Sequence, residues 1–598
     1  MLRFVRLVLL IGCLLTIVYA AGAQPASEAI RLNQLGFYPD APKVAVVVGP
    51  AGDRFQLTTP DGRTVLFSGT LSAPRRNAFS GKTTRLADFS SVTKPGTYVL
   101  TVAGVGRSYP VQIWPAVHRA LAAGALKGFY YQRTATDLPD AYAGRWARRA
   151  GHPDTHVRIH PSAASATRPA NTTIAASLGW YDAGDYNKYI VNSGITMGTL
   201  LSLYEDFPDG CRGLTVSIPE SGNALPDLLD ESLWNLRWML AMQDPADGGV
   251  YHKLTNPTFD GMVMPEQAGS AARADNRYVV QKSVTATLDF AAVMAQAGRV
   301  FRAYERQLPG LADSCVAAAV RAWAWAQQHP NALYDQDALN RQFDPDISTG
   351  TYGDRDARDE WIWAAAELYL TTRDDTYYTA VDLFPDSRTP LPAWPQVRTL
   401  AYYSLARFAD RLTPRGQPDR GRVRQHLLTL ADSLLRGVDT QPFGTVMGRS
   451  AEDFSWGSSA VAANQGIALV QAYRLTGNRR YLDAALGNLD YLLGRNAVGY
   501  SFVTGFGQKT PRHPHHRPSV ADGIDAPVPG LLSGGTNARA AQQDKCAGYT
   551  TTVADEVFLD ADCSYASNEI AINWNAPLVY LTVALEALQT HWTRAGKE

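Results

Sequence analysis

Short apolar runs separated by polar turn residues mark the first part of the chain. β-branched and aromatic residues gather in stretches bounded by Pro60-Asp61-Gly62 and Pro95-Gly96. The stretches lie at 43–49, 54–59, 63–68, 97–102 and 107–114. Strands this short and this closely spaced predict a small β-sandwich of the immunoglobulin type over residues 25–114. No constellation of acids or histidines occurs there, which favours a structural role.

From His118 onward the apolar positions follow a helical period. Ala- and Leu-rich segments predict helices at 288–308, 311–328, 361–370, 425–435, 460–475 and 575–588. The spacing Tyr–x2–Thr–x4–Tyr that begins at Tyr369 recurs from Tyr473, each time between two helical segments. Recurrent helical hairpins over residues 115–598 predict a mainly α domain, built as a closed ring or as a solenoid of helix pairs.

Composition narrows the class of protein. The 598 residues include 56 Lys+Arg and 56 Asp+Glu, so no net positive charge attracts nucleic acid. Aromatic residues make up 10% of the chain, with 28 Tyr and 13 Trp. Flat apolar faces of this kind stack on sugar rings or fill a large core, and composition leaves both readings open.

The N-terminus has the form of a secretory signal over residues 1–23. Arg3 and Arg6 precede an apolar run, and cleavage is expected between Ala23 and Gln24. The run is too short for a membrane span, so a secreted or periplasmic, monomeric protein is expected. A lipobox-like stretch ending at Cys13 offers the alternative of lipid anchoring, which the apolar residues after Cys13 disfavour.

Export makes disulfides possible among the remaining cysteines, Cys211, Cys315, Cys546 and Cys563. Four cysteines allow three pairings, of which Cys546–Cys563 is the most local. Free buried thiols are the alternative.

Two acids three residues apart stand out in the stretch 179–189. Asp182 and Asp185 flank a glycine, with Trp180, Tyr181 and Tyr186 around them. Two such close like charges cost free energy unless a water, a metal or a reaction uses them. The alternative is a helix-capping Asp followed by a turn Asp.

A dense donor cluster follows at 511–517, where His513, His515 and His516 alternate with prolines and arginines. Proline prevents the helical spacing that would let these histidines share a metal, so hydrogen-bond donors are expected. Further on, Glu569 lies among Ile570, Ile572 and Trp574. Such apolar surroundings raise the pKa of a carboxylic acid, as a general acid requires, although a solvated glutamate at a helix entry is the alternative.

Together these stretches resemble glycoside hydrolase family 9, the inverting β-1,4-glucanases, over essentially the whole mature chain. The resemblance implies an (α/α)6 barrel preceded by an immunoglobulin-like module. It also implies that Asp185 is the base that activates water and that Asp182 helps to hold this water. Glu569 falls at the position of the general acid and Asp560 at the acidic position of the same motif. His515 and Arg517 fall at positions that bind sugar near the cleavage point, and Tyr181 and Trp574 at aromatic positions beside it.

Metal sites are expected to differ from those of some relatives. The region before the base contains His152 but no cysteine, so no zinc is predicted there. Asp356, Asp359 and Glu360 resemble a family calcium cluster, whereas acids at a helix N-terminus are the alternative. A further acid expected some forty residues later is absent, and structural calcium therefore remains an open expectation. No cofactor is required for the chemistry.

The predicted function is hydrolysis of a cellulose-type β-1,4-glucan with inversion. Room for the attacking water would place the carboxyl groups of Asp185 and Glu569 about 6.5–9.5 Å apart. An exo-acting enzyme on cello-oligosaccharides or amino-sugar oligomers, or a non-catalytic carbohydrate-binding protein, are the alternatives.

Overall fold

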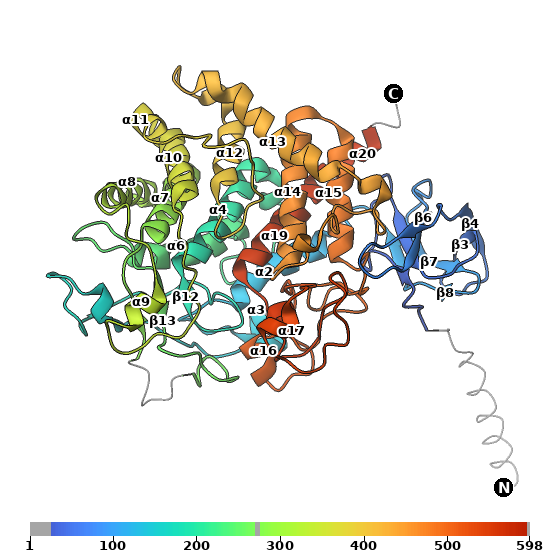
Figure 1. The fold of residues 1–598 in the computed structure, drawn as a ribbon, viewed down its shortest axis with the longest axis horizontal. Helices are drawn as coiled ribbons and strands as arrows, with labels where there is room; N and C mark the ends of the chain where they lie inside the picture. Colours follow the sequence, from blue (N-terminus) through green and yellow to red (C-terminus); the bar gives the residue numbers. More distant parts are fainter. Residues whose placement is uncertain (1–24, 269–275, 595–598) are drawn as a thin grey trace, which may run out of the picture.

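The computed structural model describes residues 25–268 and 276–594, and the predicted signal peptide and Cys13 lie outside this range. An all-β domain at one end of the molecule adjoins a larger helical domain (Figure 1). Within the described residues no helix is both long and apolar enough to cross a bilayer. The mainly α fold with a leading sandwich is as predicted.

The sandwich consists of two antiparallel sheets with the strand orders β1-β2-β6-β5 and β4-β3-β7-β8, and β9 pairs with β7. Side chains from both sheets, including Val47, Leu57 and Leu100, form its own buried core. The strand predicted at 107–114 is divided into two, because Pro110 cannot donate to the ladder. The strands are β1 (Ile30–Arg31), β2 (Val44–Val48), β3 (Arg54–Thr58), β4 (Val65–Thr70), β5 (Arg75–Arg76), β6 (Thr83–Asp88), β7 (Gly96–Val102), β8 (Gly106–Arg107) and β9 (Val111–Ile113).

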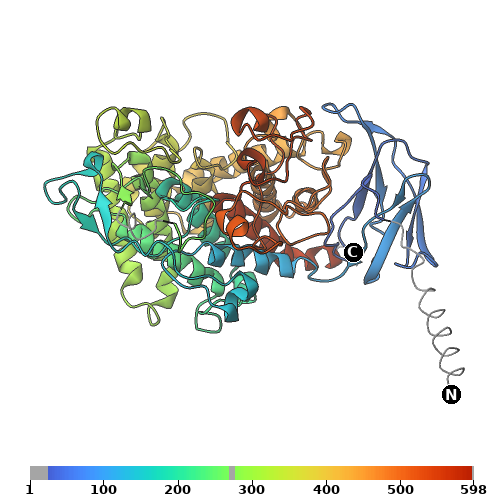
Figure 2. The ribbon, with the colours of Figure 1, turned by 90° about the horizontal axis from the view of Figure 1, so that it is seen from below.

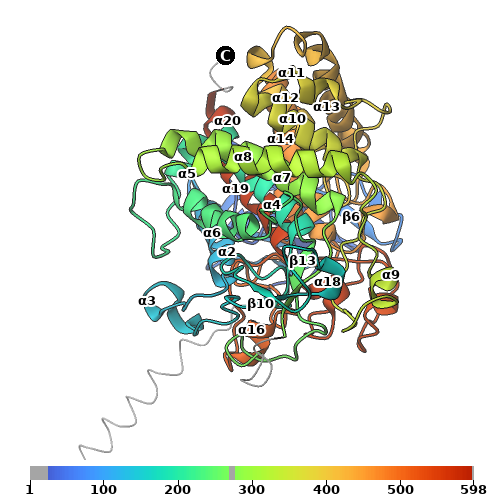
Figure 3. The ribbon, with the colours of Figure 1, turned by 90° about the vertical axis from the view of Figure 1, so that its left-hand side faces the viewer.

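The helical domain is a barrel in which inner and outer helices alternate along the chain. Inner helices are buried on most of their faces: α4 (Ile190–Asp206), α7 (Val284–Phe301), α10 (Arg358–Thr372), α12 (Arg398–Arg407), α14 (Ser458–Thr476) and α19 (Ile572–Leu588). Outer helices are α2 (Arg119–Tyr131), α6 (Asp227–Ala241), α8 (Leu311–Gln328), α11 (Asp375–Thr379), α13 (Arg420–Leu435) and α15 (Arg479–Leu492). The last inner helix, α19, packs on both α14 and α4. This contact closes the ring, so of the two predicted arrangements the closed one is present (Figure 3).

Predicted helix positions agree with the structure except at their ends. The segment 311–328 coincides with α8, whereas α19 begins three residues before the predicted start at 575 and carries Pro577 inside it. Shorter helices lie in the connections: α3 (Asp140–Ala143), α5 (Pro208–Arg212), α9 (Gln336–Asn340), α16 (Arg517–Ala521), α17 (Ala540–Gln543), α18 (Tyr565–Asn568) and α20 (Thr590–Arg594).

A small third sheet within the barrel domain was not predicted. Its order is β11-β10-β14-β13-β12, from strands of two or three residues: β10 (Val157–Ile159), β11 (Thr173–Ile174), β12 (Lys188–Tyr189), β13 (Lys253–Thr255) and β14 (Tyr278–Val279). Strands of two or three residues are too short to show an alternation of apolar and polar positions. The sheet matters because β12 directly follows the Asp182–Asp185 stretch and leads into α4.

The sandwich lies against the barrel beside its C-terminal segments (Figure 2). Buried polar side chains join the two domains, since Asn33 donates to Asp490 on α15 at 2.8 Å and Asn77 donates to Asp555 at 2.6 Å. Gln34 adds contacts to the main chain of Gly499, Gln508 and Lys509. A buried hydrogen bond to a charged group contributes about 1.5–3 kcal/mol, so this interface holds the domains in one orientation.

Candidate active site

Asp182 and Asp185 lie on a tight loop whose own main chain closes it. The N–H of Asp182 donates to the carbonyl of Asn187 at 3.0 Å, and the N–H of Ile572 at the start of α19 donates to the carbonyl of Asp182 at 2.9 Å. Asn187 also accepts from Thr255 on β13 at 3.0 Å. The loop is thus fixed by the third sheet on one side and by α19 on the other.

The two aspartates have different partners. Asp182 is 1% exposed and accepts from Asn192 at 2.6 Å and from the Tyr352 hydroxyl at 2.7 Å. Asp185 accepts from Asn187 at 2.5 Å and from the Tyr189 hydroxyl at 3.3 Å. Burial, and then the negative charge of Asp185, raise the pKa of Asp182, while its two donors oppose this shift only in part. Burial and the neighbouring Asp185 thus make ionisation of Asp182 less favourable than that of an ordinary aspartate.

Glu569 directly follows α18, and the main chain three residues beyond it, at Ile572, is already hydrogen-bonded to the loop of the aspartates. Desolvation raises the pKa of its carboxyl well above the usual value, and the charges of Asp185 and Asp182 raise it further. The charge of Arg517 and the main chain of Gly184 oppose the shift in part. The three acids, predicted from two separate stretches, therefore belong to one electrostatic unit in which burial favours the protonated form of Glu569.

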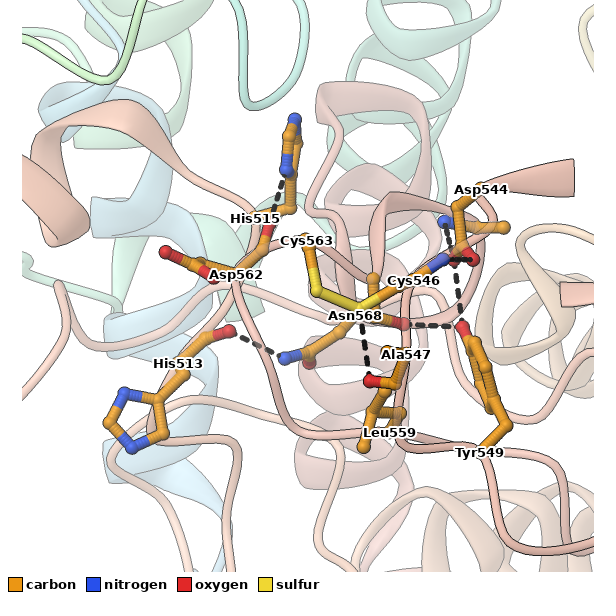
Figure 4. The surroundings of a disulfide bond; sticks show 12 residues. His513, His515, Asp544, Cys546, Ala547, Tyr549, Leu559, Asp562, Cys563 and Asn568 are labelled. Atoms are coloured by element: carbon orange, nitrogen blue, oxygen red, sulfur yellow. Dashed lines mark hydrogen bonds between the residues drawn. A yellow bond between two sulfur atoms is a disulfide. The ribbon is translucent and has the colours of Figure 1, made fainter. Parts of the chain in front are cut away.

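A parallel bridge between His515 and Glu569 places the histidine loop beside the acid. The His515 ring Nδ1 lies 2.5 Å from the carbonyl oxygen of Asp562, which can only accept, so Nδ1 carries the proton (Figure 4). Burial lowers the pKa of His515 and favours the neutral ring. Nε2 is then an acceptor, suited to a sugar hydroxyl.

Arg517 holds the loop that carries Asp182 and Asp185. Its guanidinium donates to the carbonyl of Gly184 at 2.7 Å and to that of Asp260 at 2.9 Å. A side chain at Gly184 would meet the carbonyl oxygen of His515 at 2.1 Å, so only glycine allows this close approach. The predicted Arg517 is thus part of the site, and the contacts seen are to protein carbonyls.

Asp560 supports the histidine loop. Its carboxylate accepts from the main-chain N–H groups of Arg512 and His513 at 2.8–3.0 Å and from Asn568 at 3.1 Å. These bonds occupy the carboxylate and tie the loop to the residue preceding Glu569. These contacts are those of a positioning residue, and the role that the motif implies for Asp560 stays a prediction.

Two aromatic residues predicted to contact sugar are buried instead. Tyr181 is 1% exposed, and its hydroxyl is 2.8 Å from Nδ1 of His152. Trp574 is 9% exposed and packs beneath Gly457 and Gly534. Neither offers an open ring face, because surrounding protein atoms cover almost the whole of each side chain.

Exposed aromatics that the sequence did not single out occupy this face. Trp456 is 41% exposed and its ring lies 5.6 Å from that of Tyr565, which in turn is 5.7 Å from the His515 ring. Phe259 is 48% exposed, with the Arg517 guanidinium 5.8 Å from its ring. Neither residue was assigned a role from the sequence.

The predicted calcium ligands do not converge on one point. Asp356 forms an exposed salt bridge with Arg358 at 2.5 Å, and Asp359 accepts from the N–H of Val397 at 2.6 Å. No group of three acids, histidines or cysteines in the described residues has the arrangement of a metal centre. However, both carboxylate oxygens of Glu360 and of Asp289 are buried without a hydrogen-bond donor. Calcium at this cluster, like the expected lack of zinc at His152, stays a prediction.

Cys546 and Cys563 form a disulfide, the most local of the three predicted pairings (Figure 4). It closes the loop that carries Asp555, Asp560 and Asp562. Cys211 and Cys315 are free and buried, so the alternative of free thiols holds for this pair.

Known proteins share both the sequence and the fold. Residues 119–582 match the family described as Glycosyl hydrolase family 9, and residues 25–107 match the cellulase N-terminal ig-like domain. The chain is 46% identical to the xyloglucan-specific endo-beta-1,4-glucanase BoGH9A of Bacteroides ovatus, over 98% of this chain and 99% of the relative. It is 33% identical to endoglucanase D of Acetivibrio thermocellus, over 92% of this chain and 82% of that protein.

Solved structures agree. The Bacteroides ovatus GH9 structure superposes with a TM-score of 0.89 at 46% identity, covering 94% of this chain and 99% of the other. A single mutant of the thermostable endoglucanase from Alicyclobacillus acidocaldarius gives a TM-score of 0.81 at 32% identity, with coverage of 94% and 99%. The chain therefore belongs to glycosyl hydrolase family 9 and is a glycoside hydrolase of the endo-β-1,4-glucanase type.

Proposed function

We propose that this enzyme cleaves the backbone of a β-1,4-glucan by single displacement with inversion, using Glu569 as general acid and Asp185 as general base. The observation that carries the proposal is the grouping of the three acids. Glu569, with its raised pKa, pairs along the main chain with His515, whose carbonyl oxygen lies against Gly184 of the loop that holds Asp182 and Asp185. Inverting hydrolysis needs one carboxyl group protonated and another ionised across the scissile bond.

Each residue then has a defined task. Glu569 gives its proton to the departing glycosidic oxygen, and Asp185 takes a proton from the water that attacks the opposite face of the sugar. Asp182, held by Asn192 and Tyr352, hydrogen-bonds this water. His515 Nε2 accepts from a sugar hydroxyl, and Trp456 and Phe259 offer ring faces to neighbouring sugar units.

Xyloglucan is the favoured substrate within this class. The support is the name of the Bacteroides ovatus relative, which matches this chain over nearly its whole length. Linear cellulose-type glucan is the alternative, and exo action on cello-oligosaccharides or on amino-sugar oligomers remains an outcome of the test below. Secretion or export to the periplasm and a monomeric state complete the proposal.

Two measurements test the proposal. Proton NMR of the first products should show the α-anomer before mutarotation, and a β-anomer would overturn the inverting assignment. A time course on xyloglucan, linear β-1,4-glucan and chitosan should give a rapid fall in viscosity with xyloglucan, whereas a single small product from the start would indicate exo action.

Variants assign the roles. Glu569→Gln and Asp185→Asn should each abolish hydrolysis and retain binding of xyloglucan oligosaccharides measured by calorimetry. Near-normal turnover by Asp185→Asn would overturn the base assignment. Asp525→Asn, which changes an exposed acid paired with Arg512, is the control for loss of one negative charge.

A further inference from the structure

Lys253 on β13 is a lysine that is completely buried in the third sheet. Its ammonium group donates to the side chain of Gln336 at 2.7 Å, to the Thr349 hydroxyl at 3.0 Å and to the carbonyl of Gly350 at 2.6 Å. All three acceptors are neutral, and burying a charge without a counter-ion beside it costs free energy. An apolar side chain would often fill such a place with equal or greater stability, so the charge itself calls for an explanation.

The charge of Lys253 acts on the loop of the aspartates. Across the antiparallel pair of β12 and β13, Lys253 stands opposite Tyr189, and its ammonium nitrogen lies 5.5 Å from the centre of that ring. The Tyr189 hydroxyl donates to Asp185 at 3.3 Å. Burial lowers the pKa of Lys253 to about 7, and the negative charge of Asp185 opposes this shift. The carboxylate that stabilises the buried cation is therefore that of Asp185.

A chain of side-chain hydrogen bonds joins the two groups. The hydroxyl oxygens of Thr349 and Thr255 lie 2.6 Å apart, and the Thr255 hydroxyl lies 3.0 Å from Oδ1 of Asn187. The side-chain amide of Asn187 then donates to Asp185 at 2.5 Å. From Lys253 to Asp185 each of the five residues is 5% exposed or less, so water does not compete for these bonds.

The donors of this chain all point the same way. An ammonium group can only donate, so the oxygen of Thr349 accepts from it. Two neighbours of Thr255, Oδ1 of Asn187 and the carbonyl of Asn256 at 2.8 Å, can only accept. The hydrogen of the Thr255 hydroxyl therefore points toward these acceptors, and its oxygen accepts from Thr349. A carboxylate also only accepts, which directs the NH2 group of Asn187 to Asp185.

We propose that Lys253 is a positioning residue for the base, which holds the carboxylate of Asp185 in place through Thr349, Thr255 and Asn187. The inference rests on the role of Asp185 in the proposed function and adds a buried cation behind that residue. Aligned donors polarise one another, so the positive charge strengthens the hydrogen bond that reaches the carboxylate. Because Lys253 is completely buried, it acts on the reaction only through these residues.

Steady-state kinetics of Lys253→Met on a soluble β-1,4-glucan test the inference, since methionine fills similar space without a charge or a donor. We expect kcat to fall roughly 10- to 100-fold while KM changes by less than about twofold. Lys282→Met is the matched control, because this lysine is also largely buried but pairs with Asp244 and Asp247 at 2.7 Å. Both variants should melt at a lower temperature, and only Lys253→Met should lose rate. An equal loss of kcat in both, or a rise in KM at unchanged kcat in Lys253→Met, would overturn the positioning role.

Thr255→Val cuts the chain and leaves the lysine charged, so it also decides the matter where Lys253→Met does not fold. We expect a loss of kcat similar to that of Lys253→Met, and the double variant should lose no more than the larger single change. Thr582→Val, at a buried hydroxyl that donates to the carbonyl of Leu578 within α19, is the control and should keep normal kcat. Normal kcat in Thr255→Val, or losses that multiply in the double variant, would contradict the chain.

Asp185→Asn separates this inference from the proposed function. Near-normal turnover by Asp185→Asn would overturn the base assignment itself. An inactive Asp185→Asn beside a Lys253→Met enzyme of near-normal kcat would leave that assignment intact and overturn the role of Lys253 alone.

Discussion

Arg517 donates two hydrogen bonds to one acceptor, the carbonyl oxygen of Gly184, from its guanidinium at 2.7 Å and from its own main-chain N–H at 3.2 Å. Gly184 lies between Asp182 and Asp185, so this arginine fixes Asp185, the proposed base, relative to the histidine loop. Misplacing a reacting group by about 1 Å can cost roughly 100-fold in rate.

Replacing Arg517 with alanine should therefore lower kcat by about 100-fold, with a smaller change in KM. Arg517→Lys keeps the charge but loses the fork that spans two carbonyls, so we expect it to recover only part of the rate. Steady-state kinetics on a soluble β-1,4-glucan provide the measurement. Arg512→Ala, in the same loop but exposed, should remain near normal, and an equal loss in both variants would contradict the positioning role.

The alkaline side of the pH–rate profile should report on Glu569. The protonated acid is the active form, so kcat/KM falls as pH rises through its pKa in the free enzyme. Burial raises that pKa first, and the charges of Asp185 and Asp182 add to the shift. Asp182→Asn removes one of these charges, and we expect the alkaline limb to move to lower pH.

Carbon NMR of labelled Glu569 measures the same shift directly where turnover by Asp182→Asn is too slow. Asp525→Asn serves again as the control and should leave the limb in place. An alkaline limb that moves to higher pH in Asp182→Asn would show that the Asp182 carboxyl does not act on Glu569 as a negative charge.

Sequence patterns predicted the fold and singled out the three acids of the candidate site, because both leave strong local signals. A helical period identifies α8, and the two acids around Gly184 form a compact motif. The burial of Tyr181 and Trp574 could not be predicted from the sequence, because an aromatic residue beside a motif can face either the substrate or the protein core. Exposure of Trp456, and the third sheet that positions Asn187, depend on contacts between segments far apart in the chain.

The contrast between Trp456 and Tyr181 predicts separable effects. Trp456→Ala removes an exposed ring face and should raise KM for a glucan oligosaccharide about fivefold, corresponding to about 1 kcal/mol. Tyr181→Phe removes the hydroxyl that meets His152 and should lower the melting temperature while KM stays unchanged. If KM rose in Tyr181→Phe and not in Trp456→Ala, the result would support the predicted sugar contact at Tyr181 instead.

Reduction of the Cys546–Cys563 disulfide should loosen the loop that holds His515. Its sulfur atoms join residues 17 positions apart, and closing a loop of this size stabilises a protein by about 3 kcal/mol in the chain-entropy model. We expect the variant Cys546→Ser with Cys563→Ser to melt at a lower temperature and to show a higher KM. Cys211→Ser, at a free buried thiol, gives the comparison. Added reductant should shift its melting temperature by no more than it shifts that of the parent protein.

Calcium should stabilise the protein through the buried acids near the start of α10. Burial raises the pKa of Glu360 and Asp289, and each also repels its acidic neighbours. A divalent cation would relieve this repulsion, and binding at 100-fold above Kd adds about 2.7 kcal/mol to the free energy of unfolding. Calorimetry should therefore show a higher melting temperature in CaCl2 than in EDTA, and Glu360→Gln should remove most of that difference. Asp356→Asn, at an acid already paired with Arg358 on the surface, should retain it. Equal melting temperatures for the parent protein in CaCl2 and in EDTA would mean that protons alone neutralise the cluster.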